Sequence, residues 1–472
     1  MVLWGKTQTL VAGIFLLGTL PVWASGLEFP EQGVRSVSRG GAFSAKADDP
    51  TAVAHNPGAL SKLRGTRFLY NHNLNWVWSG FTRAESVIPR NPSARDYEAS
   101  EQALESVENK TPFFPLGGFV AITHDFGLPD MTFGLSVYGP NSTGATEYPV
   151  SGGQRYLLTK LEAIMAYPGI SAAWGQENMG FGATIQWVVL PSLKYSLVVD
   201  GTPGGRISPY ASGGDVEATL DLSDSGTPTA IVGGWWRPVP QFEMAISGRV
   251  IPIRLDATGQ IVLETIDDQT SFSREQLTLP GNRAQLDLVL PQTARLGLRY
   301  RSLDGHREVW DLELDIVYEA WSIVKSYDAD LEGVVRLFAE EPIQDVSIPK
   351  NWRDTFSVRL GGTYAINTAL SLSAGGFFEQ GAIPKNYTHL DFSSHDRMGI
   401  GFGTEYKVSD TLTLTAGYGR VFQPDVEVSE AFAKVFQQRP VSQCPEGGGC
   451  DGYDGVPVNA GKFTWAAQTV SF

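Results

Sequence analysis

Six histidines are the residues of this chain best suited to acid–base or metal chemistry, and they are scattered along its 472 residues. None lies in a His-Glu-x-x-His zinc motif or a Gly-x-Ser-x-Gly nucleophile motif. His389 and His395, with Asp391 and Asp396, could form a metal site on a loop. We favour a hydrated loop, because carboxylates and histidines are common there. The sequence therefore predicts no enzyme, no metal and no cofactor.

Two cysteines offer a second kind of chemistry. Cys444 and Cys450 flank Pro-Glu-Gly-Gly-Gly in a long, glycine-rich stretch near the end of the chain. In an oxidising compartment, such a pair favours a disulfide that closes a small loop. A zinc pair is the alternative, but no further His or Cys lies nearby to complete it.

Composition limits the function further. Lys and Arg number 36 against 51 Asp and Glu, which gives a net charge of −15. Nucleic-acid backbones need a dense basic face, so this balance argues against them as partners. The chain holds 52 glycines, 11% aromatic and 18% charged residues. These values are unlike a disordered chain, which is poor in aromatics, and they favour a β-rich fold.

The first residues have the pattern of an export signal. Lys6 is the only charge before an apolar run from Leu10 to Leu20, and a Val-Trp-Ala cleavage pattern ends at Ala24. The apolar run is too short for a spanning helix, which needs about 20 residues. Residues 1–24 are therefore predicted to be a signal peptide, with the mature chain beginning at Ser25 outside the cytoplasm.

Strict alternation of apolar and polar residues runs through most of the remaining chain. Between Trp310 and Tyr318 the apolar residues alternate with Asp311, Glu313 and Asp315. Alternate side chains of a strand point to opposite faces, so each such segment has one apolar and one hydrated face. We expect about 14 strands of 8 to 12 residues. One helix is expected, around residues 96–109, and long loops at 80–115, 191–212, 257–283 and 424–461.

Two architectures can use strands of this kind, a soluble sandwich and a transmembrane barrel. Three features favour the barrel: fully charged residues on the polar faces, tryptophans near strand ends, and a last strand that closes on Phe472. The predicted fold is thus all-β, a transmembrane antiparallel β-barrel of about 14 strands over residues 65–472 in the outer membrane of a Gram-negative bacterium. The strand-end tryptophans include Trp76, Trp78, Trp187, Trp235, Trp236, Trp310, Trp321 and Trp352.

Residues 25–64 do not alternate and are rich in small and turn-forming residues. Asp49 can cap a short helix that starts at Pro50, and Asn-Pro-Gly at 56–58 ends it in a turn. A barrel of about 14 strands encloses more room than its own side chains fill. We therefore predict that this segment is a hatch that plugs the lumen.

The same segment resembles the FadL/TodX family of outer-membrane transporters for hydrophobic compounds. The resemblance rests on Gly-Gly-Ala-Phe at 40–43, Ala-Asp-Asp-Pro at 47–50 and Asn-Pro-Gly-Ala-Leu at 56–60, where the family usually has Asn-Pro-Ala-Gly-Leu. Gln-Arg-Tyr at 154–156 and several strand motifs extend it along the chain. The hatch motif is assigned to Gly40, Gly41, Asp48, Asp49, Asn56, Pro57 and Gly58.

The resemblance implies a monomer that takes up long-chain fatty acids or other hydrophobic compounds. Ligand is held in an apolar lumen pocket and released laterally after the hatch rearranges. Other implied partners are outer-membrane lipid, lipopolysaccharide and the barrel assembly machinery. A general diffusion porin and a surface adhesin or receptor are the alternatives, and a barrel enzyme has little support.

A carboxylate head on the ligand would need a cation inside the barrel, since a buried carboxylate needs a partner. Arg155, in the Gln-Arg-Tyr match, and Lys160 are the candidates for this ligand-binding role. Balancing the many lumenal acids is an equally good explanation of both.

Overall fold

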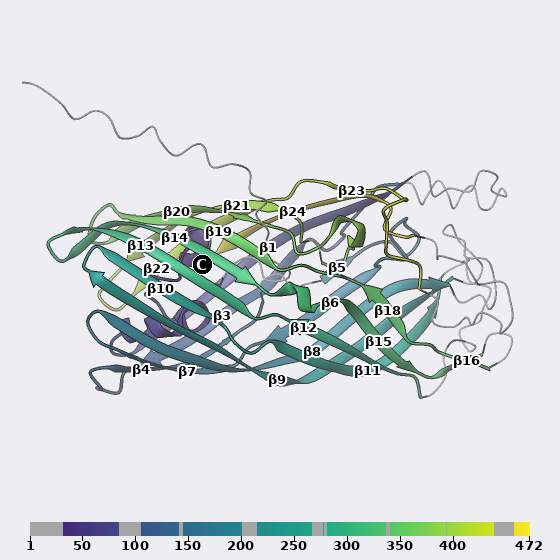
Figure 1. Ribbon diagram of the computed structural model, residues 1–472, viewed down its shortest axis with the longest axis horizontal. Coiled ribbons are helices and arrows are strands. Elements are labelled where there is room, and N and C mark those ends of the chain that lie inside the picture. Colours follow the sequence, from purple (N-terminus) through teal and green to yellow (C-terminus); the bar gives the residue numbers. More distant parts are fainter. Residues whose placement is uncertain are drawn as a thin grey trace, which may run out of the picture.

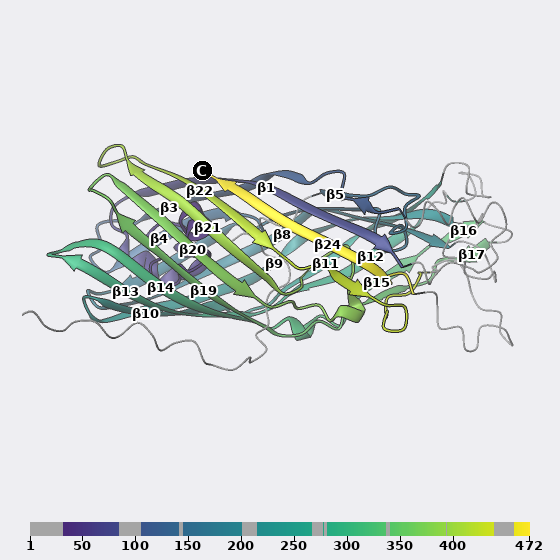
Figure 2. The ribbon, with the colours of Figure 1, turned by 90° about the horizontal axis from the view of Figure 1, so that it is seen from above.

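Alternating strands build a long antiparallel wall that closes on itself (Figures 1 and 2). The computed structural model describes residues 32–84, 105–140, 145–200, 215–266, 277, 281–336, 340–392, 394–438 and 457–472. The expected signal peptide at 1–24 and the Cys444–Cys450 pair lie outside these residues. None of the described helices is long and apolar enough to cross a membrane.

The predicted barrel is confirmed, with a closed wall of 14 strands. Each strand is antiparallel to its neighbours, and β24 pairs with β1 to close the ring. In order around the wall, the strands are β1 (Arg67–Arg83), β3 (Phe113–His124), β4 (Met131–Tyr138), β7 (Gly169–Gly175), β8 (Met179–Asp200), β9 (Asp215–Val239), β10 (Phe242–Arg249), β13 (Thr293–Asp304), β14 (Arg307–Glu319), β19 (Thr355–Ala365), β20 (Leu370–Glu379), β21 (Arg397–Lys407), β22 (Thr413–Phe422) and β24 (Gly461–Ser471).

The two ends of the barrel differ. Strands at one end are joined by short turns, such as residues 305–306 between β13 and β14. Outer-membrane barrels place short turns in the periplasm and long loops outside the cell, so the opposite end is the outer one. There β8 and β9 continue beyond the wall into an extension, whose other described strands are β2 (Val107–Glu108), β5 (Ala145–Glu147), β6 (Lys160–Ala166), β11 (Ile253–Thr265), β12 (Arg283–Leu290), β15 (Ser326–Glu332), β16 (Val334–Arg336), β17 (Glu340–Pro342), β18 (Val346–Pro349) and β23 (Val426–Val428).

This extension changes two expectations. Parts of the segments expected as loops at 80–115, 191–212 and 257–283 are strands, because they pair edge to edge and so satisfy their backbone groups. The end of the helix expected at 96–109 is the short strand β2, which pairs with β1. The first part of that expected helix lies outside the described residues.

The faces of the wall follow the alternation in the sequence. On β14, Leu312 and Ile316 point outward and are exposed, whereas Asp311, Glu313 and Asp315 point inward and are buried. The outer face is therefore apolar, as lipid contact requires. The inward charges lie in the lumen as predicted, but they are buried instead of facing a water-filled channel.

The tryptophan girdle is only partly present. Trp187, Trp236 and Trp310 are exposed on the outer face of the wall. The girdle prediction is wrong for Trp321 and Trp352. These two side chains are buried against each other in the outer extension, with ring centroids 5.0 Å apart. Trp235 is also buried, and its neighbours belong to the hatch.

The hatch occupies the lumen near the periplasmic end, seen as purple coils inside the barrel in Figure 1. It contains α1 (Val34–Ser38), α2 (Ala52–His55) and the 3-10 helix η1 (Pro57–Lys62), after which β1 starts at Arg67. Two further 3-10 helices, η3 (Trp321–Ile323) and η4 (Lys385–Tyr387), lie between wall strands on the outer side.

Candidate ligand pocket and hatch

The hatch helix α1 rests on a smooth patch of the wall. Gly361, Gly375 and Gly401 belong to the neighbouring strands β19, β20 and β21. A Cβ atom on Gly361 or Gly375 would collide with backbone atoms of Arg39, and one on Gly401 with the carbonyl oxygen of Val37. Glycine at these places lets the hatch backbone approach the wall closely.

Arg39, at the end of α1, is the main anchor of the hatch. Its guanidinium donates to both carboxylate oxygens of Asp311, at 3.1 and 2.8 Å, and to Glu313 at 3.1 Å. It also donates to the Thr363 hydroxyl at 2.7 Å and to the hatch carbonyl of Ala42 at 2.9 Å. All of these groups except Thr363 are almost completely buried, so the charges depend on one another for solvation.

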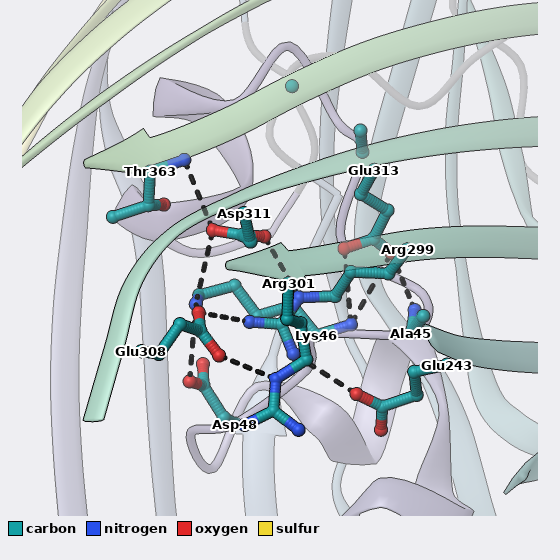
Figure 3. A network of polar contacts seen from close by, with 12 residues as sticks. Ala45, Lys46, Asp48, Glu243, Arg299, Arg301, Glu308, Asp311, Glu313 and Thr363 are labelled. Carbon is teal, nitrogen blue, oxygen red and sulfur yellow. Dashed lines mark hydrogen bonds and ion pairs between the residues drawn. The ribbon is translucent and has the colours of Figure 1, made fainter. Parts of the chain in front are cut away.

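A second layer of ion pairs surrounds this anchor (Figure 3). Lys46 of the hatch lies 3.0 Å from Glu308 and 3.5 Å from Asp311. Arg299 on β13 joins the same carboxylates and donates to Glu243 at 3.1 Å. Arg301 donates to Glu308 at 2.7 Å. Charges of the hatch and of three wall strands thus form one continuous network.

Carboxylates of β14 also hold the Gly-Gly-Ala-Phe turn of the hatch motif. Asp315 accepts from the backbone N–H groups of Phe43 and Ser44, both at 3.0 Å, and from the Ser44 hydroxyl at 2.6 Å. Glu313 accepts from the N–H of Ala45 at 2.6 Å. The alternation in the sequence places these acids on one face, but it carries no signal that their partners lie some 270 residues away.

Gly40 and Gly41 both have positive φ, which favours glycine. Asp48 pairs with Arg35 of α1 at 2.9 Å, and Arg35 also contacts Glu405 on β21. The nearby cations Lys46 and Arg35 keep the pKa of the Asp48 carboxyl below its usual range. These residues of the predicted motif shape the hatch and bind it to the wall.

Asp49 accepts from the Thr51 N–H at 2.8 Å, just before α2 begins at Ala52. Burial raises the pKa of this carboxyl. The prediction that Asp49 caps a helix starting at Pro50 is wrong, because α2 starts at Ala52 and its cap residue is Thr51. Asp49 instead fixes the turn just before the helix.

Asn56 fixes the Asn-Pro-Gly turn in three directions. Its side-chain oxygen accepts from the N–H of Gly58 at 3.1 Å and starts η1 with Pro57 in first position. Its amide donates to the carbonyls of Ser44 at 2.9 Å and of Gly234 on β9 at 3.2 Å. The turn therefore joins two parts of the hatch and the wall, instead of only ending α2.

Lys62 and Trp235 hold the other end of the hatch. Lys62 pairs with Glu243 on β10 and lies 4.8 Å from the centre of the Trp235 ring. The indole N–H of Trp235 donates to the Ser61 hydroxyl at 3.0 Å. Burial lowers the pKa of Lys62, so the charged form of its amine relies on Glu243 for stabilisation. Because Trp235 packs against Ser61 and Lys62 of the hatch, it is absent from the outer girdle.

An apolar pocket lies in the outer extension, above the hatch. Its walls come from β8, β9, β11, β12, β15 and β18, so residues far apart in sequence meet there. The described lining residues are Tyr195, Leu197, Val199, Ala218, Leu220, Ile261, Leu286, Tyr327, Ala329, Leu331, Val346, Ile348 and Gln438. Concave sites lined mainly by apolar side chains hold hydrophobic ligands.

A buried charged cluster lies behind two tyrosines of this pocket. Lys350 donates to Asp391 at 2.5 Å, and His389 lies 2.9 Å from the same carboxyl. Tyr195 donates to Asp391 at 3.2 Å, and Lys350 lies 4.7 Å from the centre of the Tyr327 ring. Burial alone would raise the pKa of Asp391, but His389 and Lys350 hold it below the usual range.

The hydrated loop that we favoured for these histidines is therefore wrong. His389, Asp391 and His395 are buried, because the loop after β20 folds onto the outer extension. A metal site finds no support either, since no group of three His, Cys, Asp or Glu side chains with metal-binding geometry occurs among the described residues. Asp391 is occupied by Lys350, and Asp396 accepts from the N–H of Gly381 at 2.9 Å.

The two predicted carboxylate-binding cations lie apart from the pocket lining. Arg155 is buried, 3.3 Å from Asp215, with Tyr156 between them donating to the same acid at 2.7 Å. Lys160 is partly exposed at the start of β6 and pairs with Glu162 at 3.1 Å. Both cations have carboxylate partners within the protein. Their role in ligand binding stays a prediction.

The shape of the whole chain matches several solved structures. A FadL homologue from Pseudomonas aeruginosa has a TM-score of 0.70 at 17% identity, covering 95% of this chain and 98% of that one. The toluene transporter TodX of P. putida has a TM-score of 0.62 at 15% identity, covering 93% and 96%. The Ralstonia pickettii toluene transporter TbuX has a TM-score of 0.61 at 12% identity, covering 93% and 97%. The TM-scores establish a shared fold.

Sequence similarity decides the family. The profile of the family described as outer membrane protein transport protein (OMPP1/FadL/TodX) matches residues 15–443. The chain belongs to the FadL/TodX family. No curated protein matches it. Membership places this FadL/TodX protein in the outer membrane as a transport channel for hydrophobic compounds rather than an enzyme.

Proposed function

We propose that this FadL/TodX protein collects hydrophobic compounds in the outer pocket and releases them sideways into the outer membrane when the hatch moves. The observation that carries the proposal is an apolar pocket whose lining packs in the same cluster of buried side chains as the hatch. Pocket residues and the hatch residues Phe43, Val53 and Leu60 belong to one connected group of buried apolar side chains. A hydrophobic ligand that follows this path avoids full hydration.

The anchoring of the hatch suits a part that moves. Its helix α1 lies on glycines, so few side chains interlock with the wall. Its charged groups can exchange their protein partners for water. The net cost is modest, because removing two charges from water offsets much of the attraction within a buried pair. Two arrangements of similar energy, biased by ligand contacts, are sufficient to gate a passive channel.

A lateral exit is best supported beside β4. Among the described residues, β3 pairs with β4 only from Phe119 to His124, whereas its part from Phe113 to Gly118 pairs with β1 alone. Three buried rings lie at the upper end of this ladder. Phe119 stacks on Tyr138 with centroids 4.8 Å apart, and Tyr138 meets Tyr167 edge-on at 5.3 Å. An interrupted ladder is the natural place for a wall to open.

The hatch contacts this same place. Gln32 donates from its side chain to the carbonyl of Gly139, just after β4, at 2.8 Å. The carbonyl of Gln32 lies 2.7 Å from a ring nitrogen of His55 at the end of α2. Displacement of the hatch would therefore remove a contact next to the interruption, which couples the plug to the proposed exit.

A reversible tether tests whether the hatch must move. A Cβ atom built on Gly297 lies 3.0 Å from the Cβ of Ser44, closer than the about 3.5–4.5 Å of a disulfide, and 2.9 Å from a carboxylate oxygen of Asp315. S44C with G297C therefore requires the hatch and the wall to separate slightly at this contact. The pair is made in a chain carrying C444S and C450S. Uptake of radiolabelled toluene and decanoate by cells is then measured in oxidised and reduced states.

We expect the oxidised double variant to bind but not transport, and reduction to restore uptake. The S44C and G297C single variants are the controls, because neither can form the tether. Full uptake by the oxidised protein would refute hatch movement at this contact. Free passage of ions and hydrophilic solutes through the untethered protein would instead favour a general porin.

A further inference from the structure

We propose that the outer pocket selects uncharged hydrophobic compounds and takes an organic acid only in its protonated form. This inference rests on the proposed function, because it concerns the ligand of the same pocket. It rests on how the charges around the pocket are already matched within the protein.

No charged side chain lines the pocket among the described residues. Most of its walls are aliphatic, and the polar atoms come from Tyr195, Tyr327 and Gln438. Ten strand residues of the lining are buried, so the pocket interior is largely shielded from water. Eight of these ten are aliphatic and the other two are the tyrosines. An ionised carboxylate brought into such a site needs a cation or several donors, which this lining does not supply.

A buried cation close to the pocket is already neutralised. Lys350 lies behind Tyr327 and is paired with Asp391 at 2.5 Å, while Tyr195 uses its hydroxyl to donate to the same carboxyl. Burial also lowers the pKa of His389 beside Asp391, which favours its neutral form. One cation and one anion therefore balance, and the cluster has no surplus positive charge for a ligand.

Breaking this pair to receive a ligand carboxylate would leave Asp391 buried beside a second negative charge. Such an unpaired buried charge is strongly unfavourable. Arg155 gives no alternative, since it is paired with Asp215 and does not line the pocket. The cluster is better explained as a rigid polar support that fixes the two tyrosines of the pocket.

The size of the expected selection follows from ionisation. A carboxylic acid has a pKa of about 4.3, so at pH 7.5 its neutral form is about one part in 10³. If only that form enters the pocket, the acid binds about 10³-fold more weakly than its methyl ester. Each unit by which the pH falls from 7.5 to 5.5 should restore about tenfold of its affinity.

Octanoate and methyl octanoate are the probes. Each displaces the neutral fluorescent probe N-phenyl-1-naphthylamine from the purified full-length protein at pH 7.5, 6.5 and 5.5. The variant A329W, which fills the pocket, gives the detergent background; if it does not fold, A218F on β9 serves instead. The expected result is pH-independent binding of the ester and a tenfold gain per pH unit for the acid.

A cation placed at the edge provides the converse test. Q438K adds a positive charge to the pocket lining and should raise octanoate binding at pH 7.5 while leaving the ester unchanged. Equal, pH-independent affinities of acid and ester in the wild type would overturn the selection but leave the pocket as the ligand site. Unaltered binding in a folded pocket-filled variant would instead refute the proposed function itself.

Discussion

Replacing Arg39 with methionine should unlatch the hatch. Methionine keeps much of the length of the side chain but removes the donors that reach Asp311, Glu313 and Thr363. Removing one partner of a buried pair costs about 3–5 kcal/mol. We expect the lower end, because Asp311 keeps Arg299 at 2.9 Å and Glu313 keeps the N–H of Ala45.

A loss of about 3 kcal/mol shifts the hatch equilibrium toward release by about 10²-fold, since 1.36 kcal/mol corresponds to a factor of ten. Open events in planar bilayers should become about 10² times more frequent, and hatch amides should exchange hydrogen correspondingly faster. R35M is the matched control on the same helix. Arg35 is partly exposed, so its pairs should contribute about 0–1 kcal/mol.

The reasoning would be refuted by R39M protein that folds, stays closed in bilayers and protects its hatch amides as the wild type does. In that case the glycine patch and apolar packing, rather than the ion pairs, would hold the hatch. Equal effects of R39M and R35M would show that burial of the network does not matter.

Two further changes probe the hatch seat and the outer loop. Gly375→Ala should destabilise hatch docking by about 1–3 kcal/mol through overpacking against Arg39, and so raise the conductance in planar bilayers. Gly376→Ala is the control, because its Cβ meets its nearest atom only at 3.0 Å and should change the conductance much less. Equal conductance of the two variants would contradict this. Burial and then nearby positive charges lower the pKa of His395 to about 4, so the folded protein binds fewer protons than the unfolded one below pH 6.5. Stability of the outer loops should therefore fall by about 2 kcal/mol between pH 7 and pH 5, measured by thermal unfolding, and H395N should lose this pH dependence; an unchanged pH profile in H395N would assign the effect to another group.

Local patterns in the sequence predict the fold well, because the alternation of a strand is written in neighbouring residues. The inward acids Asp311, Glu313 and Asp315 follow directly from it, as does the apolar outer face. Turn-forming residues at 40–58 likewise predict a compact, non-strand segment. The family resemblance then supplies the hatch as a plug.

Contacts between distant segments could not be predicted in this way. Nothing local to Asp315 indicates that its partners are the amides of Phe43 and Ser44, or that Trp235 leaves the membrane surface to meet the hatch. His389 has the sequence surroundings of a hydrated loop, yet it is buried.

The sequence by itself determined a β-barrel with a plug, because side-chain alternation and turn chemistry act over a few residues. Only the tertiary structure decided which charges pair and where ligand is held. The pocket takes its lining from six strands between Tyr195 and Ile348, and the anchor joins Arg39 to β14. Burial and charge neutralisation are properties of the assembled wall, so they appear only when those strands close around the hatch.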